Sequence, residues 1–220
     1  MIEAMGNPDL ELVDPFPLFT PPHTPHEVGL SEAGLRPLRP LRVFQDVAAF
    51  IDAFVGGKDS DEARVTLEDA LADCDTYKQW QRSMPFLKDV PSIHAYRNRP
   101  YNDLAAVNRE ILRHGGYLRA GQILYRGGRF GPDKSVVTDG PMSTSMHPSV
   151  ARWHASEVSG QIGVLRVAAS RSVLAFVYRI SGNQRLTHEY EVLLQDRLYL
   201  EQNAVRNVGG IEVRTYDLWS

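Results

Sequence analysis

The sequence contains a single cysteine, Cys74, among its 220 residues. One cysteine cannot form an intrachain disulfide, and a zinc site built from cysteines needs several thiolates, so both are excluded. Cys74 lies in a stretch whose apolar residues have helical spacing, without the surrounding pattern of a nucleophile. We therefore predict that it is a small core residue.

Long hydrophobic runs and an excess of one charge are also missing. The longest apolar stretch, 162–178, is interrupted by Arg166 and Arg171, whereas a membrane-spanning helix needs about 20 predominantly apolar residues. Residues 1–8 lack the basic and apolar regions of a signal peptide. The net charge of -3 lacks the basic excess typical of proteins that bind nucleic acid. We expect a soluble protein, cytoplasmic in the producing or the target cell.

The composition, with 43% hydrophobic and 23% charged residues, is typical of a globular protein. Residues 1–40 differ from the rest, because they hold eight of the 14 prolines and should be extended or irregular. Apolar residues there, such as Phe16, Phe19 and Leu30, indicate that part of this arm packs on the domain. We predict a Pro-rich arm over 1–40 and one domain over 41–220. The alternative is that the arm is a delivery or partner-binding segment.

The first half of the domain has the apolar spacing of helices. It predicts helices over 43–55, over 59–74 and over about 101–114, and glycine pairs follow the first and the third. Asn108 lies on the apolar stripe of the third helix. A buried amide needs hydrogen-bond partners, so we expect Asn108 to bond a neighbouring loop.

The second half of the domain has short runs rich in β-branched and aromatic residues, which favour strands. These runs are 123–126, 141–145, 162–168, 173–178, 190–194 and 211–218. A further helix is predicted from Pro148 to about Val158. Because helices gather before the strands, the sequence predicts an α+β fold, which we expect to contain two packed β-sheets with helices ahead of them.

Two glutamates, Glu189 and Glu191, flank Tyr190 where a strand is predicted to start. Residues i and i+2 of a strand project to one face, so both carboxylates should lie close together. Two carboxylates held close disfavour the ionisation of one of them, which suits acid or base chemistry. The alternative is an ordinary pair on a solvated strand face.

Arg126 ends a predicted strand and is followed by Gly127 and Gly128. Glycines let a ligand approach the backbone, and a guanidinium binds phosphate or carboxylate oxygens. The alternative is an arginine that ends a strand before a turn.

Three hydroxyls, in Ser143-Thr144-Ser145, precede the predicted helix at Pro148. No nucleophile elbow surrounds them, and the alternative is capping of that helix by Ser145 or His147. His147 and His154 could form a metal pair, but core or surface histidines are the simpler interpretation, and Trp153 is expected in the core. We predict no metal site.

Taken together, these segments resemble the arginine–serine–glutamate (R-S-E) class of mono-ADP-ribosyltransferases over residues 93–220. This class includes catalytic subunits of clostridial binary toxins, secreted bacterial effectors and tailed-phage enzymes. The residues that carry the resemblance are, in order, Tyr96, Tyr101, Asn108, Leu112-Arg113, Leu124-Tyr125-Arg126-Gly127, Ser143-Thr144-Ser145 and Glu189-Tyr190-Glu191-Val192-Leu193-Leu194.

The resemblance implies an ADP-ribosyltransferase fold and transfer of ADP-ribose from NAD, without a metal, to an arginine of a target protein. Arg126 would hold the NAD phosphates, the Gly127 backbone would bind the nicotinamide carboxamide, and Ser143 would orient Glu191. Thr144 and Ser145 would support the pocket.

By the same resemblance, Glu191 would hold the ribose 2′-hydroxyl and stabilise the cation formed as nicotinamide leaves. Glu189 would serve the acceptor, since a glutamate there goes with arginine targets. The loop 179–188 would contact the target, although it lacks the aromatic residue common in the family. An immunity or chaperone partner is a further possible partner. The alternatives are an NAD glycohydrolase with the same site and an inactive binding or inhibitor module.

Overall fold

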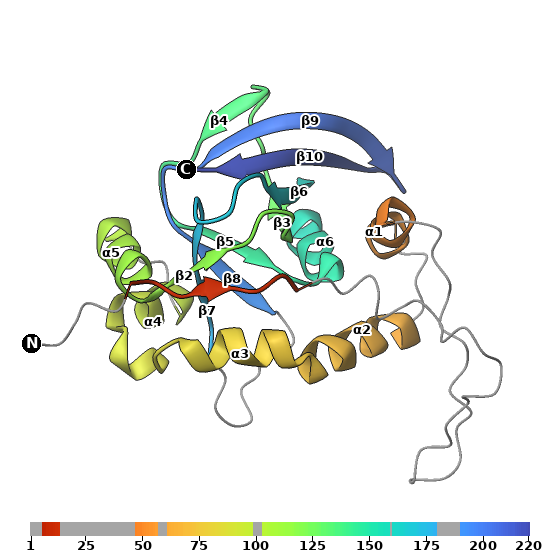
Figure 1. The fold of residues 1–220 in the computed structure, drawn as a ribbon. Coiled ribbons are helices and arrows are strands. Elements are labelled where there is room, and N and C mark those ends of the chain that lie inside the picture. Colours follow the sequence, from red (N-terminus) through yellow and green to blue (C-terminus); the bar gives the residue numbers. More distant parts are fainter. Residues whose placement is uncertain (1–5, 14–46, 57–60, 99–102, 159, 180–189) are drawn as a thin grey trace, which may run out of the picture.

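The computed structural model describes residues 6–13, 47–56, 61–98, 103–158, 160–179 and 190–220. Within them, most helices precede a large sheet, so the predicted α+β class is confirmed (Figure 1). The helices of this part of the chain are α1 (Val47–Val55), α2 (Asp61–Asp73), α3 (Asp75–Ser83), the short 3-10 helix η2 (Leu87–Asp89), α4 (Pro91–Asn98), α5 (Leu104–His114) and α6 (Pro148–Glu157).

Four of the helices follow the sequence patterns closely. Helices α1, α2, α5 and α6 match the predicted helices within the described residues, and the Asp103 side chain caps α5 by accepting from the Ala106 amide at 2.9 Å. Helix α4 has no counterpart among the predicted helices, and Pro91 is its first residue. Proline is tolerated there, since the first turn of a helix has no internal partner for that amide.

The described strands form one sheet in the order β1-β2-β7-β8-β5-β3-β6-β10-β9-β4. They are β1 (Asp9–Leu10), β2 (Gly116–Leu118), β3 (Ile123–Gly128), β4 (Ser135–Val137), β5 (Met142–Ser145), β6 (Gln161–Val167), β7 (Leu174–Val177), β8 (Glu191–Leu194), β9 (Tyr199–Val208) and β10 (Ile211–Trp219).

We expected two packed sheets, and by hydrogen bonding the described strands form one continuous sheet with two halves. Strand β3 pairs with β6 along its whole length, but with β5 only through Tyr125 and Ser145. That one pair joins the half containing β5 and β8 to the half containing β6, β9 and β10. The sequence could not show this pair, because strand pairing across the join is long-range.

Part of the N-terminal arm lies against the sheet. Asp9 and Leu10 pair with β2 in parallel, and Leu10 and Val13 are buried. The Asn7 side-chain amide donates to two carbonyl oxygens at the end of α5, at 3.0 and 2.9 Å. The other arm residues proposed to pack on the domain, Phe16, Phe19 and Leu30 among them, lie outside the described residues.

Helix α6 packs directly on strand β3. A side chain at Gly127 would lie 1.9 Å from the Ala151 carbonyl oxygen, so glycine is required for this close approach. The capping interpretation of the residues before α6 is confirmed: Ser145 Oγ accepts from the His147 amide at 2.9 Å, and His147 Nδ1 accepts from the Ser149 amide at 3.1 Å. These bonds fix how β5 leads into α6.

Predictions about the core have a mixed outcome. Asn108 is buried and its side-chain oxygen accepts from the Asp196 amide at 2.9 Å, as expected for a brace to a loop. Cys74 is partly buried against the core. Trp153 is 56% exposed, so its placement in the core was wrong. No helix in the described part of the chain is long and apolar enough to cross a membrane.

Candidate active site

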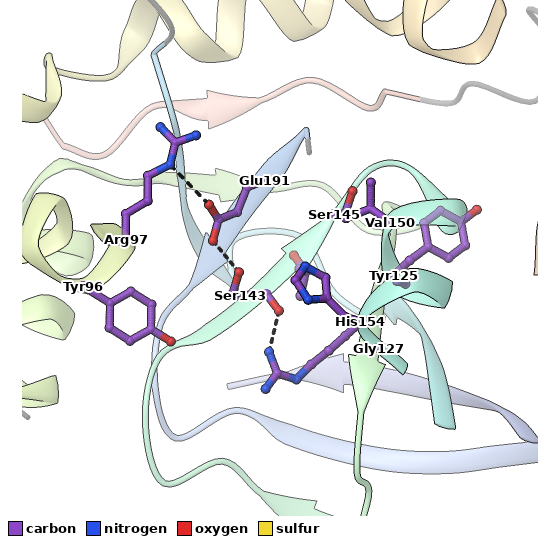
Figure 2. Close-up of a pocket in the computed structure, with 12 residues that line it drawn as sticks. Tyr96, Arg97, Tyr125, Gly127, Ser143, Ser145, Val150, His154 and Glu191 are labelled. Atoms are coloured by element: carbon purple, nitrogen blue, oxygen red, sulfur yellow. Dashed lines mark hydrogen bonds and ion pairs between the residues drawn. The ribbon is translucent and has the colours of Figure 1, made fainter. Parts of the chain in front are cut away.

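A cavity of about 440 Å³ lies where α4, α6 and the central strands meet (Figure 2). All the predicted site residues that the structure describes line this cavity, whereas Glu189 lies outside the described residues. The lining residues are Tyr96, Arg97, Tyr125, Arg126, Gly127, Ser143, Thr144, Ser145, Val150, Ala151, His154 and Glu191.

The order of the strands brings Arg126, Ser143 and Glu191 together. Strands β8, β5 and β3 are neighbours, and Ser145 pairs with Glu191 on one side and with Tyr125 on the other. Each of the three site residues therefore lies on a different strand, although Ser143 and Glu191 are 48 positions apart.

Arg126 connects β3 with β5 through its side chain. Its Nη1 donates to the Ser143 carbonyl oxygen at 2.6 Å. Burial lowers the pKa of Arg126 and the nearby Tyr96 raises it, but a guanidinium stays charged in proteins. Arg126 therefore supplies a fixed positive charge at the cavity wall.

The Glu191 carboxylate has a partner on each oxygen. Ser143 Oγ donates to Oε1, and Arg97 Nε lies 3.8 Å from Oε2. The side chain of Glu191 is only 13% exposed. A carboxylate with so little solvent around it needs charged or hydrogen-bonding groups in place of water, and Arg97 and Ser143 are such groups.

Tyr96 adds a neutral hydroxyl beside these charges. Burial raises the pKa of Tyr96 most, Arg126 lowers it, and Glu191 raises it further. The phenol is therefore protonated near neutral pH and can donate a hydrogen bond. Figure 2 shows its hydroxyl directed toward the Ser143 side of the cavity.

Tyr190 determines how the chain enters strand β8. Its φ is 45°, in the left-handed region, and the strand begins only at Glu191. The Tyr190 hydroxyl donates to the Glu68 carbonyl oxygen at 2.5 Å, which holds this turn against α2. The expectation that Glu189 and Glu191 share a strand face assumed an extended Tyr190, and Glu189 itself lies outside the described residues.

Thr144 and Ser145 support the site from the strand itself. Thr144 Oγ1 donates to the Val192 carbonyl oxygen at 2.6 Å, which strengthens the pairing of β5 with β8. Gly127 lines the cavity as expected, but the space beside its Cα is taken by α6. Its backbone, not an open gap, is therefore what faces the cavity.

Several lining residues were missed as site residues in the sequence. Arg97 follows Tyr96 on α4, a helix that the sequence patterns did not predict, and no motif marks it. His154 was interpreted as a core or surface histidine, with a metal pair as the alternative. Among the described residues, no group of three or more His, Cys, Asp or Glu side chains is placed to hold a metal ion.

No protein-family model matches the chain, and no curated protein matches its sequence. Solved structures do match, among them the Vis toxin of Vibrio splendidus, an ADP-ribosyltransferase. It is 12% identical, with a TM-score of 0.42 over 74% of this chain and 87% of that one. The C3 exoenzyme of Clostridium limosum is 13% identical, with a TM-score of 0.36 over 80% and 96%. Exoenzyme S of Pseudomonas aeruginosa, solved with carba-NAD bound, is 14% identical, with a TM-score of 0.34 over 80% and 69%.

Proposed function

We propose that the chain is an NAD-dependent mono-ADP-ribosyltransferase of the R-S-E class that modifies an arginine of a target protein. The observation that supports this proposal is the bonded path from Arg126 through Ser143 to Glu191 in one cavity. These residues are far apart in sequence, and the resemblance names the same three as the core of the site.

The cavity suits NAD in size and charge. Its volume of about 440 Å³ lies within the range of about 300–1,000 Å³ usual for small-molecule sites. The Arg126 guanidinium would complement the diphosphate, and the Gly127 backbone, which lines the cavity, would bind the nicotinamide carboxamide. Glu191 provides an anion for the ribose, whose ring becomes positive during the reaction.

The proposed reaction breaks the bond between ribose C1′ and the nicotinamide nitrogen. Nicotinamide leaves as a neutral molecule and takes the bonding electrons, which leaves positive charge on the ribose. The Glu191 carboxylate stabilises that charge and binds the 2′-hydroxyl. A guanidinium nitrogen of the target then bonds to C1′ and loses a proton, for which Glu189 is the proposed acceptor.

The decisive experiment incubates the protein with labelled NAD and a cell lysate, followed by mass spectrometry of the labelled side chain. We expect ADP-ribose on arginine, together with released nicotinamide. Glu191→Gln should reduce both by about 100-fold or more, since it removes the charge that stabilises the transition state. Wild-type rates in that variant would contradict the proposal.

The same experiment separates the two alternatives. Free ADP-ribose without labelled protein, in any lysate, would identify an NAD glycohydrolase. Absence of NAD binding in calorimetry would identify an inactive binding or inhibitor module on the same fold.

A further inference from the structure

Arg97 is an arginine of the cavity to which the sequence assigned no role. Its Nε lies 3.8 Å from Glu191 Oε2, and its side chain is only 6% exposed. Ser143 binds the other carboxylate oxygen, so Glu191 is held from two sides, by α4 and by β5. Figure 2 shows this path from Arg97 through Glu191 to Ser143. A carboxylate held in this way cannot rotate freely.

The guanidinium of Arg97 is itself held in place. Its central carbon lies 4.6 Å from the centroid of the Tyr178 ring, and Tyr178 is 2% exposed. Gln81 Nε2 of α3 donates to the Tyr178 carbonyl oxygen at 3.2 Å. A guanidinium stacked on a buried aromatic face gains a cation–π interaction and loses freedom to turn.

The helix that carries Arg97 is fixed at its other end. Glu110 of α5 accepts from the amides of Ser92 and Ile93 in the first turn of α4, at 3.1 and 2.9 Å. A carboxylate at that end also complements the helix dipole. Because Ile93 is fully buried, α4 is packed as well as capped, and Arg97 in its last turn has a defined position.

The tyrosines near Glu191 in the described part of the chain do not replace this charge. Tyr77 of α3 and Tyr96 of α4 interact with Glu191, but burial raises the pKa of both phenols, so they are neutral near pH 7. Arg126 and His154 line the same cavity, and the Arg126 guanidinium donates to the Ser143 carbonyl oxygen. Arg97 forms an ion pair with the carboxylate.

We propose that Arg97 is a positioning residue, which keeps Glu191 ionised and oriented toward the ribose, and that Tyr178 orients Arg97. This inference rests on the proposed function, because it assigns Arg97 to the reaction that Glu191 would support. It differs from a substrate-binding role, since Arg97 Nε lies near Glu191 Oε2 and the guanidinium carbon lies over the Tyr178 ring.

The test compares Arg97→Gln and Arg97→Lys with the wild type in nicotinamide release, measured as kcat and KM over a pH series, with NAD affinity from calorimetry. Arg97→Gln should lower kcat by about 10- to 100-fold, with less than about threefold change in NAD affinity. As the pH is lowered, the activity of Arg97→Gln should begin to fall at a pH about one unit higher than in the wild type. Without the neighbouring positive charge, the Glu191 carboxylate is protonated more easily.

Arg97→Lys separates charge from orientation. It keeps the positive charge, so its pH profile should resemble that of the wild type, whereas its kcat should fall because an ammonium does not reproduce the stacked guanidinium. If Arg97→Gln does not fold, Arg97→Lys still tests the positioning role, which predicts a lower kcat with unchanged NAD affinity. Arg166→Gln is the matched control, since Arg166 pairs with Asp217 at 2.8 Å and does not line the cavity.

Two results would overturn the inference. One is a loss of NAD affinity in the Arg97 variants as large as their loss of kcat/KM, which would make Arg97 a substrate-binding residue. The other is wild-type kcat with an unchanged pH profile. Both differ from failure of the proposed function, in which the wild type itself releases no nicotinamide from NAD.

Discussion

Glu191 shows how a few contacts prepare one side chain for a charged role. Its carboxylate is nearly excluded from solvent, and yet Ser143 and Arg97 give each oxygen a partner. Fixed partners of this kind do not need to reorganise when charge develops in a reaction. The preceding residue, Tyr190, has a left-handed backbone conformation, and strand β8 begins directly after it, at Glu191.

Glu189 is proposed to take a proton from the acceptor arginine, whereas Glu191 is proposed to stabilise the ribose cation. Glu189→Gln should abolish transfer to arginine while part of the NAD hydrolysis remains. Cleavage of the ribose–nicotinamide bond needs the charge of Glu191, whereas a guanidinium also needs a group to take its proton. Labelled target and free ADP-ribose, measured in one reaction, would show the two effects separately.

The control for this variant is Glu201→Gln, which removes an exposed glutamate from strand β9. It should leave both activities unchanged. Equal loss of transfer and hydrolysis in Glu189→Gln would contradict a role of Glu189 that is limited to the acceptor arginine.

The contact between helix α6 and strand β3 shapes the cavity. Both elements contribute lining residues, and Gly127 is where their backbones approach most closely. Gly127→Ala should lower the free energy of unfolding by about 1–3 kcal/mol or more, because its methyl group would overlap the backbone of α6. Urea unfolding would measure this change.

Gly128→Ala is the matched control one residue away. The nearest atom to a side chain there, Arg126 Nε, is 4.0 Å distant, so the substitution meets no backbone. We expect its free energy of unfolding to change by less than about 1 kcal/mol. Similar destabilisation in both variants would mean that general glycine flexibility, and not the α6 contact, explains the result.

Two buried tyrosines, Tyr190 and Tyr77, should make the free energy of unfolding of the whole protein depend on pH in the alkaline range. Burial raises the pKa of Tyr190 from 10.0 to about 12, with Glu68 and Asp69 adding to the effect, and it raises that of Tyr77 further. Above the ordinary pKa of tyrosine and below the raised pKa, each phenol keeps its proton in the folded protein and loses it in the unfolded chain. The free energy of unfolding therefore falls as the pH rises. It should be unaffected by these groups below about pH 10 and decrease from there through about pH 12.

Urea unfolding at several pH values would measure this decrease in the wild type and in Tyr190→Phe. The variant has no phenol to ionise at this position, so its stability should fall less steeply with pH. An identical slope in the two proteins would contradict the assignment to Tyr190.

Local patterns predicted the parts of the fold in which neighbouring residues decide the structure. Val107, Asn108 and Ile111 are buried on one side of α5, as their spacing predicts. Helix α3 was missed because it buries only Tyr77 and Trp80 on an otherwise polar helix. Helix α4 was missed because Pro91 indicates a turn as readily as a first helical turn, and Arg97 was missed with it.

The α+β class, the order of Arg126, Ser143 and Glu191, and the capping of α6 could all be predicted from the residues alone. These depend on spacing and on contacts between near neighbours. The folded chain was needed to show that β8, β5 and β3 lie side by side, that one residue pair joins the halves of the sheet, and that Arg97 meets Glu191. Each of these contacts joins segments distant in the chain, and the periodicity of one segment carries no information about which other segment it will meet.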